Sequence, residues 1–248
     1  MSVLSNLISD LKTVYRLAKP VRGDTHQERL ENFYSTQSKD YDRFRQRLLH
    51  GREELYRSLA DGDRDGKVWV DFGGGTGANF ESIGDRLSKL ASIYIVDLSP
   101  SLLQVARSRI ADSGWTNMKT VEADIAGFVP PEGSVDIVTF SYSLTMIPDW
   151  FAAIDRAEKI LKPGGAIGVV DFYVSRKHPP EGWKRHSFFD RHFWPIWFAT
   201  DNVFLSPDRL AYLHHRFDTV SLVENMGSLP FLPGFKVPYY RFIGSKRQ

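Results

Sequence analysis

Residues 68–77 read Val-Trp-Val-Asp-Phe-Gly-Gly-Gly-Thr-Gly, and this stretch decides the fold. The apolar run from Val68 to Phe72 has the length and composition of a short buried strand. Four glycines follow directly between Gly73 and Gly77, and glycines at a strand-to-helix turn let the backbone approach a ligand closely. The stretch therefore predicts a strand, a tight turn and a helix that together form one edge of a ligand site.

The pattern continues beyond this turn as strands that alternate with helices. We expect helices over 78–87, 99–113 and 149–161. We expect further strands over 92–97, 118–122, 135–140 and 166–171, a turn over 162–165, and a closing hairpin over 219–224 and 239–244. Such alternation predicts an α/β fold with a mostly parallel sheet covered by helices on both faces.

The glycine turn lacks the two standard pyrophosphate-binding signatures. A dinucleotide-binding turn requires a glycine at position 80, which is Phe80 here, and the chain has no Gly-Lys-Ser or Gly-Lys-Thr run. Asp71 at the tip of the strand would repel a phosphate and suits a ligand that carries an amine.

Two later strands also end in acidic residues. Asp97 lies 20 residues after Gly77, where a carboxylate can accept hydrogen bonds from two ribose hydroxyls. Asp124 and Ile125 follow the third strand, where an acidic side chain could hold an adenine amine and an apolar neighbour could cover the ring.

Together these features resemble those of class I S-adenosylmethionine-dependent methyltransferases. The resemblance covers residues 67–172 and rests on Asp71-x-Gly-x-Gly-x-Gly77, Asp97, Asp124 and Leu161-Lys-Pro-Gly-Gly165. It implies a Rossmann-like sandwich with a seven-stranded, mostly parallel sheet and an antiparallel C-terminal hairpin. It also implies that S-adenosylmethionine is the cofactor and S-adenosylhomocysteine the product. The residues expected to bind the cofactor are Asp71, Gly73, Gly75, Gly77, Asp97, Leu98, Asp124, Ile125 and Ser141.

Residues 174–217 interrupt the alternation, and we expect them to form a substrate lid before the last two strands. Between Arg176 and Phe204 the insert is rich in aromatic and basic residues. The aromatic side chains either bury themselves as a small core or form an apolar, basic surface for a lipid with a charged headgroup. In the second interpretation the substrate is bound by Trp183, Arg185 and Trp194. The histidines of the insert match no zinc spacing, so no metal is expected.

The composition excludes several function classes. The chain has 248 residues, a net charge of +2 and no cysteine. The modest charge gives no support for a nucleic-acid partner, and the missing cysteines exclude disulfides and thiolate metal sites. Residues 140–143 are Phe-Ser-Tyr-Ser, not the Asn/Asp-Pro-Pro-Tyr motif of many nucleobase methylases, which argues further against nucleic acid. No apolar run approaches the roughly 18 residues of a membrane-spanning helix.

Residues 1–60 are expected to form a helical extension, or cap, in front of a methyltransferase domain over 61–248. Apolar residues repeat at helical spacing over 1–19, and Pro20 ends the pattern. This helix either packs on the domain or on a partner, or lies at a membrane interface with its basic side chains near lipid headgroups.

A second resemblance concerns motifs near the N-terminus. They are Val21-Arg-Gly-Asp-Thr-His26, Glu28-Arg-Leu-Glu-x-Phe-Tyr34, Tyr41-Asp-x-Phe-Arg45 and Leu48-Leu-His-Gly-Arg-Glu-Glu54. They look like those of the N-methyltransferase component of betaine-lipid synthesis. This implies a cytoplasmic, peripherally membrane-associated enzyme that methylates the amine of diacylglyceryl-homoserine three times. A separate aminocarboxypropyl transferase would supply that lipid, because 248 residues leave no room for a second catalytic domain.

Methyl transfer to an amine needs little acid–base chemistry, because the sulfonium methyl is already electrophilic and the enzyme has only to align the amine and exclude water. The candidate proton acceptors or orienting residues are Tyr34, Tyr41, His50 and Tyr142. Arg52 or Arg45 would bind the homoserine carboxylate. Alternatively, Tyr41 and Arg45 close over the methionine end of the cofactor.

Two other functions stay open. The first is a methyltransferase for a soluble small amine or an isoprenoid quinone ring, since the same lid would cover any apolar acceptor. The second is a non-catalytic adenosyl-binding scaffold, and the intact acidic residues and glycines of the turn argue against it.

Overall fold

The computed structural model describes residue 28 and residues 47–200, 202–229 and 232–248. The helix predicted over 1–19 and the candidate site residues Tyr34, Tyr41 and Arg45 lie outside the described residues. The division into an extension over 1–60 and a domain over 61–248 stays a prediction.

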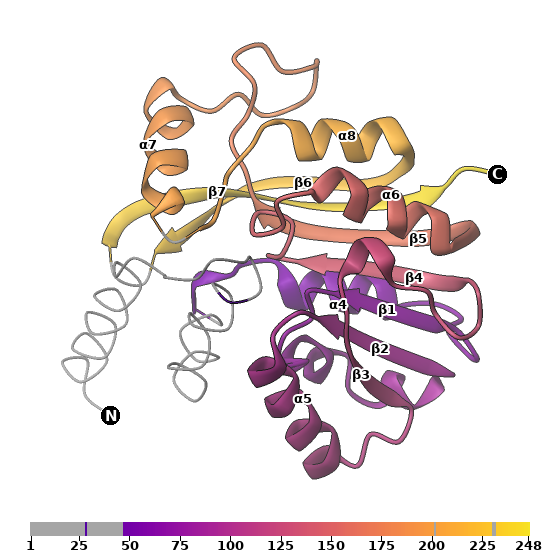
Figure 1. Cartoon of the computed structure of the whole chain (residues 1–248). Helices are drawn as coiled ribbons and strands as arrows, with labels where there is room; N and C mark the ends of the chain where they lie inside the picture. The colour runs from indigo at the N-terminus through magenta and orange to yellow at the C-terminus, as the bar shows by residue number, and fades with distance from the viewer. Residues whose placement is uncertain (1–27, 29–46, 201, 230–231) are drawn as a thin grey trace.

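A seven-stranded sheet forms the centre of the molecule (Figure 1), in the order β3-β2-β1-β4-β5-β7-β6. The strands are β1 (Val68–Phe72), β2 (Ser92–Asp97), β3 (Met118–Glu122), β4 (Val135–Ser141), β5 (Leu161–Phe172), β6 (Phe217–Leu229) and β7 (Leu232–Lys246). The first five strands pair in parallel, and β7 is antiparallel to both β5 and β6. The predicted fold class is confirmed.

Helices cover both faces of the sheet because alternate side chains of each strand point to opposite faces. The helical elements are α4 (Arg52–Ala60), η1 (Ala78–Lys89), α5 (Pro100–Ser113), η2 (Ile125–Gly127), α6 (Trp150–Ile160), α7 (Phe188–Ala199) and α8 (Asp208–Arg216). On β1, Trp69 packs with α4, η1 and α5 in one core cluster. Its neighbours Val70 and Phe72 pack with α6 and α8 in the other.

The elements differ from the sequence prediction in three places. The helix expected over 78–87 is a 3-10 helix that runs to Lys89, with a kink at Gly84 where φ is +55°. The closing strands extend well beyond 219–224 and 239–244, because β6 and β7 pair with each other along nearly their whole length. The turn expected over 162–165 is part of β5, and its pairing with β4 is irregular there.

The insert contains two helices. α8 packs on α6, β6 and β7, so it is the helix that connects β5 to the antiparallel pair. α7 lies outside this layer, beside the end of the sheet where β7 begins (Figure 1). None of the helices in the described part of the chain combines the length and apolarity needed to cross a bilayer.

Glycine at position 168 of β5 allows α4 to lie directly on the sheet. A Cβ atom at this position would collide with Leu59 Cδ1 and lie 3.1 Å from Leu55 Cδ1. Both leucines are buried, so neither has free space into which to move.

We therefore expect Gly168→Val to lower the free energy of unfolding by about 1–3 kcal/mol through overpacking. Urea denaturation followed by circular dichroism measures this change. Gly127→Ala is the control, because nothing lies within 4 Å of a Cβ placed there. Equal stability of the two variants would show that α4 does not depend on this close approach.

Candidate active site

Three buried aspartates mark the edge of the sheet where the parallel strands end. Asp71 is the second-to-last residue of β1, Asp97 is the last residue of β2, and Asp171 is the second-to-last residue of β5. The carboxyl ends of parallel strands meet at one edge, and this is where open α/β sheets bind ligands.

Asp71 is held by hydrogen bonds from within the protein. Its Oδ1 accepts from Tyr56 Oη of α4 at 2.6 Å and from Thr139 Oγ1 of β4 at 2.7 Å. Burial, followed by the charge of Asp71, raises the pKa of Tyr56 well above its usual value, so the phenol stays a neutral donor. Asp71 therefore ties α4, β1 and β4 together, and its predicted place beside a ligand amine stays a prediction.

The glycine turn packs against its neighbours too closely for larger residues. Gly73 N donates to Val96 O at 2.8 Å, and a Cβ at Gly73 would lie 2.5 Å from Ser143 Cβ. At Gly77 the φ angle is +68°, and a Cβ would lie 2.6 Å from Ile95 Cδ1. These glycines are thus required by internal packing as well as by a ligand that approaches the turn.

Asp97 connects the glycine turn to the second βα unit. Its Oδ2 accepts from Gly75 N at 2.9 Å, and its Oδ1 accepts from Ser99 N at 2.9 Å. Each carboxylate oxygen can accept more than one hydrogen bond, so Asp97 keeps acceptor capacity for two ribose hydroxyls. The residue fits its predicted role.

The remaining predicted cofactor residues have different environments. Ser141 ends β4, and its buried hydroxyl has no hydrogen-bond partner among the described residues, as expected of a group that meets a ligand. Leu98 is half-buried beside Asp97. Asp124 is exposed and caps η2 through Ala126 N, while Ile125 is buried in the core. The hydroxyl of Ser141, the carboxylates of Asp97 and Asp124 and the close-packed glycine turn together fit S-adenosylmethionine.

Tyr142 follows β4 in a backbone conformation that is rare for tyrosine, with φ at +54°. Its hydroxyl donates to His50 O at 2.7 Å, and burial, followed by the charge of Asp171, raises its pKa well above the usual value. The neutral phenol is therefore a donor, and the geometry favours the orienting role over the proton-accepting one. Both roles stay predictions.

His50 lies beside the antiparallel pair of strands. Its Nε2 is 2.9 Å from Ser228 O, and its ring stacks on Tyr239. A carbonyl oxygen can only accept, so Nε2 carries the proton and Nδ1 is the acceptor of the neutral ring. Two candidate proton acceptors, His50 and Tyr142, lie in the described residues. Of these two, His50 is the one that offers an acceptor atom.

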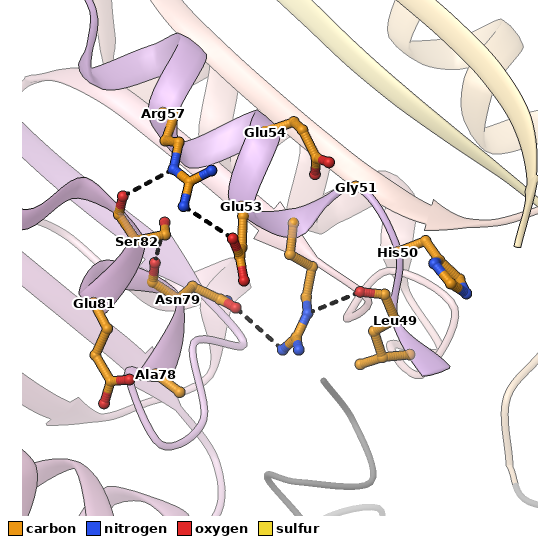
Figure 2. A pocket seen from close by; sticks show the side chains of 11 residues that line it. Leu49, His50, Gly51, Glu53, Glu54, Arg57, Ala78, Asn79, Glu81 and Ser82 are labelled. Atoms are coloured by element: carbon orange, nitrogen blue, oxygen red, sulfur yellow. Dashed lines mark hydrogen bonds and ion pairs between the residues drawn. The ribbon is translucent and has the colours of Figure 1, made fainter. Parts of the chain in front are cut away.

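A pocket of about 480 Å³ opens between the start of α4 and the start of η1. Arg52 is one of the residues that line this pocket (Figure 2), where its Nη1 donates to Asn79 Oδ1 at 3.2 Å and its Nε donates to Leu49 O at 3.2 Å. The other lining residues are His50, Gly51, Glu53, Glu54, Arg57, Ala78, Glu81 and Ser82. Both signs of charge are present, and the pocket adjoins the glycine turn through Ala78.

The three predicted substrate residues of the insert are placed differently, and none lines the Arg52 pocket. Trp194 is buried, and its Nε1 donates to Asp190 Oδ1 at 3.1 Å. Trp183 is half-buried against His214, with ring centroids 4.4 Å apart. Arg185 is exposed. Trp194 thus belongs to the core cluster that also contains Trp69, and substrate binding by these residues stays a prediction.

Sequence reasoning identified Asp171 as the end of a strand and missed its role at the site. Asp171 accepts hydrogen bonds from Thr145 N at 3.0 Å, Thr145 Oγ1 at 2.8 Å and Phe172 N at 2.8 Å. It therefore fixes the loop that carries Tyr142. Burial raises the pKa of Asp171 to about 6, and the nearby charge of Arg209 opposes that rise. The signal in the sequence was an acidic residue at the end of a buried strand, as for Asp71 and Asp97.

We expect the stability of the protein to depend on the ionisation of Asp171. The folded state holds this proton more tightly than the unfolded chain, so the contribution to folding is greatest below pH 3.8 and is lost as the pH rises through about 6. The stability of Asp171→Asn relative to wild type should therefore improve by up to about 3 kcal/mol between about pH 4 and about pH 8. Urea denaturation at several pH values tests this, and a difference independent of pH would contradict it.

Comparison with known proteins identifies the family. Residues 22–198 match the ubiE/COQ5 methyltransferase family. The ubiquinone/menaquinone biosynthesis C-methyltransferase UbiE of Hydrogenovibrio crunogenus is 24% identical over 172 residues, which are 68% of this chain and 67% of that protein. The demethylmenaquinone methyltransferase of Lactococcus lactis is 23% identical over 149 residues, 59% of each chain. The matches thus span about half to two thirds of the relatives' lengths.

Solved structures agree on the fold. Phosphoethanolamine N-methyltransferase 2 of Haemonchus contortus, in complex with S-adenosyl-L-methionine, superposes with a TM-score of 0.66 at 14% identity, over 91% of this chain and 61% of that one. The N-methyltransferase NodS of Bradyrhizobium japonicum, in complex with S-adenosyl-L-homocysteine, gives 0.59 at 15% identity, over 94% of this chain and 98% of that one. With the family match spanning more than half of its length, the chain belongs to the ubiE/COQ5 family of class I S-adenosylmethionine-dependent methyltransferases.

Proposed function

We propose that this methyltransferase acts on an acceptor dissolved in a membrane, and that the ring of an isoprenoid quinol is the acceptor with the strongest support. The observation that carries this proposal is the family match, because the curated relatives are named for methylation in ubiquinone and menaquinone biosynthesis. The aromatic insert next to the carboxyl edge of the sheet supports an apolar acceptor.

Different residues at the carboxyl edge would bind different parts of the methyl donor, S-adenosylmethionine. We propose that Asp97 accepts hydrogen bonds from the ribose hydroxyls, that Ser141 donates to the cofactor and that Asp124 meets the adenine amine. When bound, S-adenosylmethionine supplies an electrophilic methyl group. The chain then has to orient the acceptor and exclude water.

Methylation of a ring carbon requires that a quinol hydroxyl lose its proton. We propose His50 Nδ1 as the proton acceptor, because His50 Nε2 is bonded to Ser228 O and Nδ1 can accept. Tyr142 is less suited to accept a proton, since its phenol stays neutral and donates to His50 O. Tyr142 would orient the segment that carries His50.

A second candidate is successive methylation of the amine of diacylglyceryl-homoserine to the trimethylated betaine lipid. Two observations favour it. The motifs between Val21 and Glu54 resemble those of betaine-lipid N-methyltransferases. The Arg52 pocket is lined by both acidic and basic side chains, which suits an acceptor that carries an amine and a carboxylate. In this case a separate aminocarboxypropyl transferase would supply the lipid.

Incubation of the protein with methyl-labelled S-adenosylmethionine and one acceptor at a time distinguishes these candidates. We expect label in a demethylated quinol presented in vesicles. Label in diacylglyceryl-homoserine, in one, two and three stages, would favour the second candidate. Label in neither, with methylation of a small soluble amine, would contradict a membrane-dissolved acceptor.

We expect Asp97→Ala to weaken S-adenosylmethionine binding at least about tenfold, since hydrogen bonds to a charged group contribute about 1.5–3 kcal/mol each. Isothermal titration calorimetry measures the affinity, and thermal unfolding shows whether the variant is folded. Asp112→Ala on the exposed face of α5 is the control. An unchanged affinity of Asp97→Ala would mean that the cofactor lies elsewhere.

A further inference from the structure

We propose that the outer face of α7, together with the basic segment before it, is a docking surface for an anionic lipid bilayer. The α7 face consists of Phe188, Phe189 and Ile196, and the basic segment is residues 176–185. This inference goes beyond the choice of methyl acceptor and does not depend on it.

The α7 face is apolar where a surface helix is normally polar. The exposed fractions of Phe188, Phe189 and Ile196 are 73%, 51% and 72%. Within the described residues, eight large apolar side chains are at least 45% exposed to solvent, and four of them lie between Phe188 and Phe204. The spacing of Phe189 and Ile196 places them on the same side of the helix.

The opposite side of α7 is already used by the protein. Trp194 and Phe198 are buried in the core cluster, and Phe193 and Trp197 are half-buried against it. Among the described residues, the core cluster covers one side of α7, and the α7 face on the other side is exposed. The rings of Phe188 and Phe189 stack on His192 and Phe193 of α7 itself. The α7 face therefore has the composition of a contact surface and stays largely exposed in the described part of the chain.

Charge identifies the partner. Between Arg176 and Thr200 the chain has five basic and two acidic residues, so this segment carries +3 while the whole chain carries +2. Lys177, Lys184 and Arg185 are exposed and form no ion pair with any other described residue. Aromatic side chains insert at the headgroup level of a bilayer, and basic side chains beside them attract anionic lipids.

The position of α7 gives this surface a purpose. The insert begins three residues after Asp171, beyond the end of β5 at Phe172, and Phe204 N donates to Thr145 O at 2.8 Å. Asp171 and Thr145 belong to the carboxyl edge of the sheet. In Figure 1, α7 lies beside this edge. Docking through the α7 face would therefore bring the active-site edge to the membrane, where a lipid-dissolved acceptor could enter without crossing water.

Sedimentation of the full chain with phosphatidylcholine vesicles, with and without phosphatidylglycerol, tests the proposal. We expect tighter binding to the anionic vesicles and a loss of at least about tenfold for Phe188→Glu/Ile196→Glu, since each apolar side chain contributes at least about one factor of ten on burial. Val220→Glu on β6 is the matched control, because that side chain is 67% exposed at a distant position of the chain.

A charge variant separates the two parts of the surface. Lys177→Glu/Lys184→Glu should reduce binding to anionic vesicles severalfold and leave binding to neutral vesicles unchanged. S-adenosylmethionine affinity, measured for every variant, should be unchanged and shows that the fold is intact.

Three results would overturn the proposal. They are absence of vesicle binding by the wild type, equal binding by Phe188→Glu/Ile196→Glu, and lipid-free self-association that this double variant abolishes, which would assign the α7 face to a second copy of the chain. Methylation of a detergent-dispersed acceptor is measured separately. If the acceptor is methylated but the protein does not bind vesicles, the docking proposal is contradicted and the proposed acceptor is not. If the protein binds vesicles but the acceptor is not methylated, the proposed acceptor is contradicted and the docking proposal is not.

Discussion

The buried carboxylate of Asp71 is the interaction on which the rest of the site depends. It accepts hydrogen bonds from Tyr56 and Thr139, which join α4 and β4 to β1 at the point where the glycine turn begins. A Cβ at Gly74 would lie 2.7 Å from Asp71 Oδ2, so the carboxylate also favours glycine at position 74. Removal of this acceptor would leave a buried phenol unsatisfied, at a cost of about 1–3 kcal/mol.

This arrangement assigns different tasks to acidic residues that look equivalent in the sequence. Asp71 accepts hydrogen bonds from Tyr56 and Thr139 through Oδ1 and lies against the glycine turn. Asp97 is bonded to the backbone but has acceptor capacity left for a ligand. Asp171 fixes the loop that carries Tyr142 and retains a raised pKa. β1, β2 and β5 thus each contribute one carboxylate near their ends, and the available donors decide what each carboxylate does.

Local patterns predicted the elements, and long-range packing decided the details. The strand periodicity predicted the sheet, and the resemblance carried by the glycine turn, Asp97 and Asp124 predicted the cofactor. The effect of the Arg209 charge on the pKa of Asp171 could not be predicted, because the two residues lie on different elements. The aromatic run of α7 gave no indication of its direction, since Trp194 and Phe188 have similar hydrophobicity although one is buried and the other exposed.

The central claim is that Asp97 meets the ligand while Asp71 serves the protein. A crystal structure of the protein with S-adenosylhomocysteine tests it most directly. The account predicts both ribose hydroxyls hydrogen-bonded to Asp97, with the bonds from Tyr56 and Thr139 to Asp71 unchanged. A ribose bound away from Asp97, or a ligand amine that displaces Tyr56 from Asp71, would contradict it.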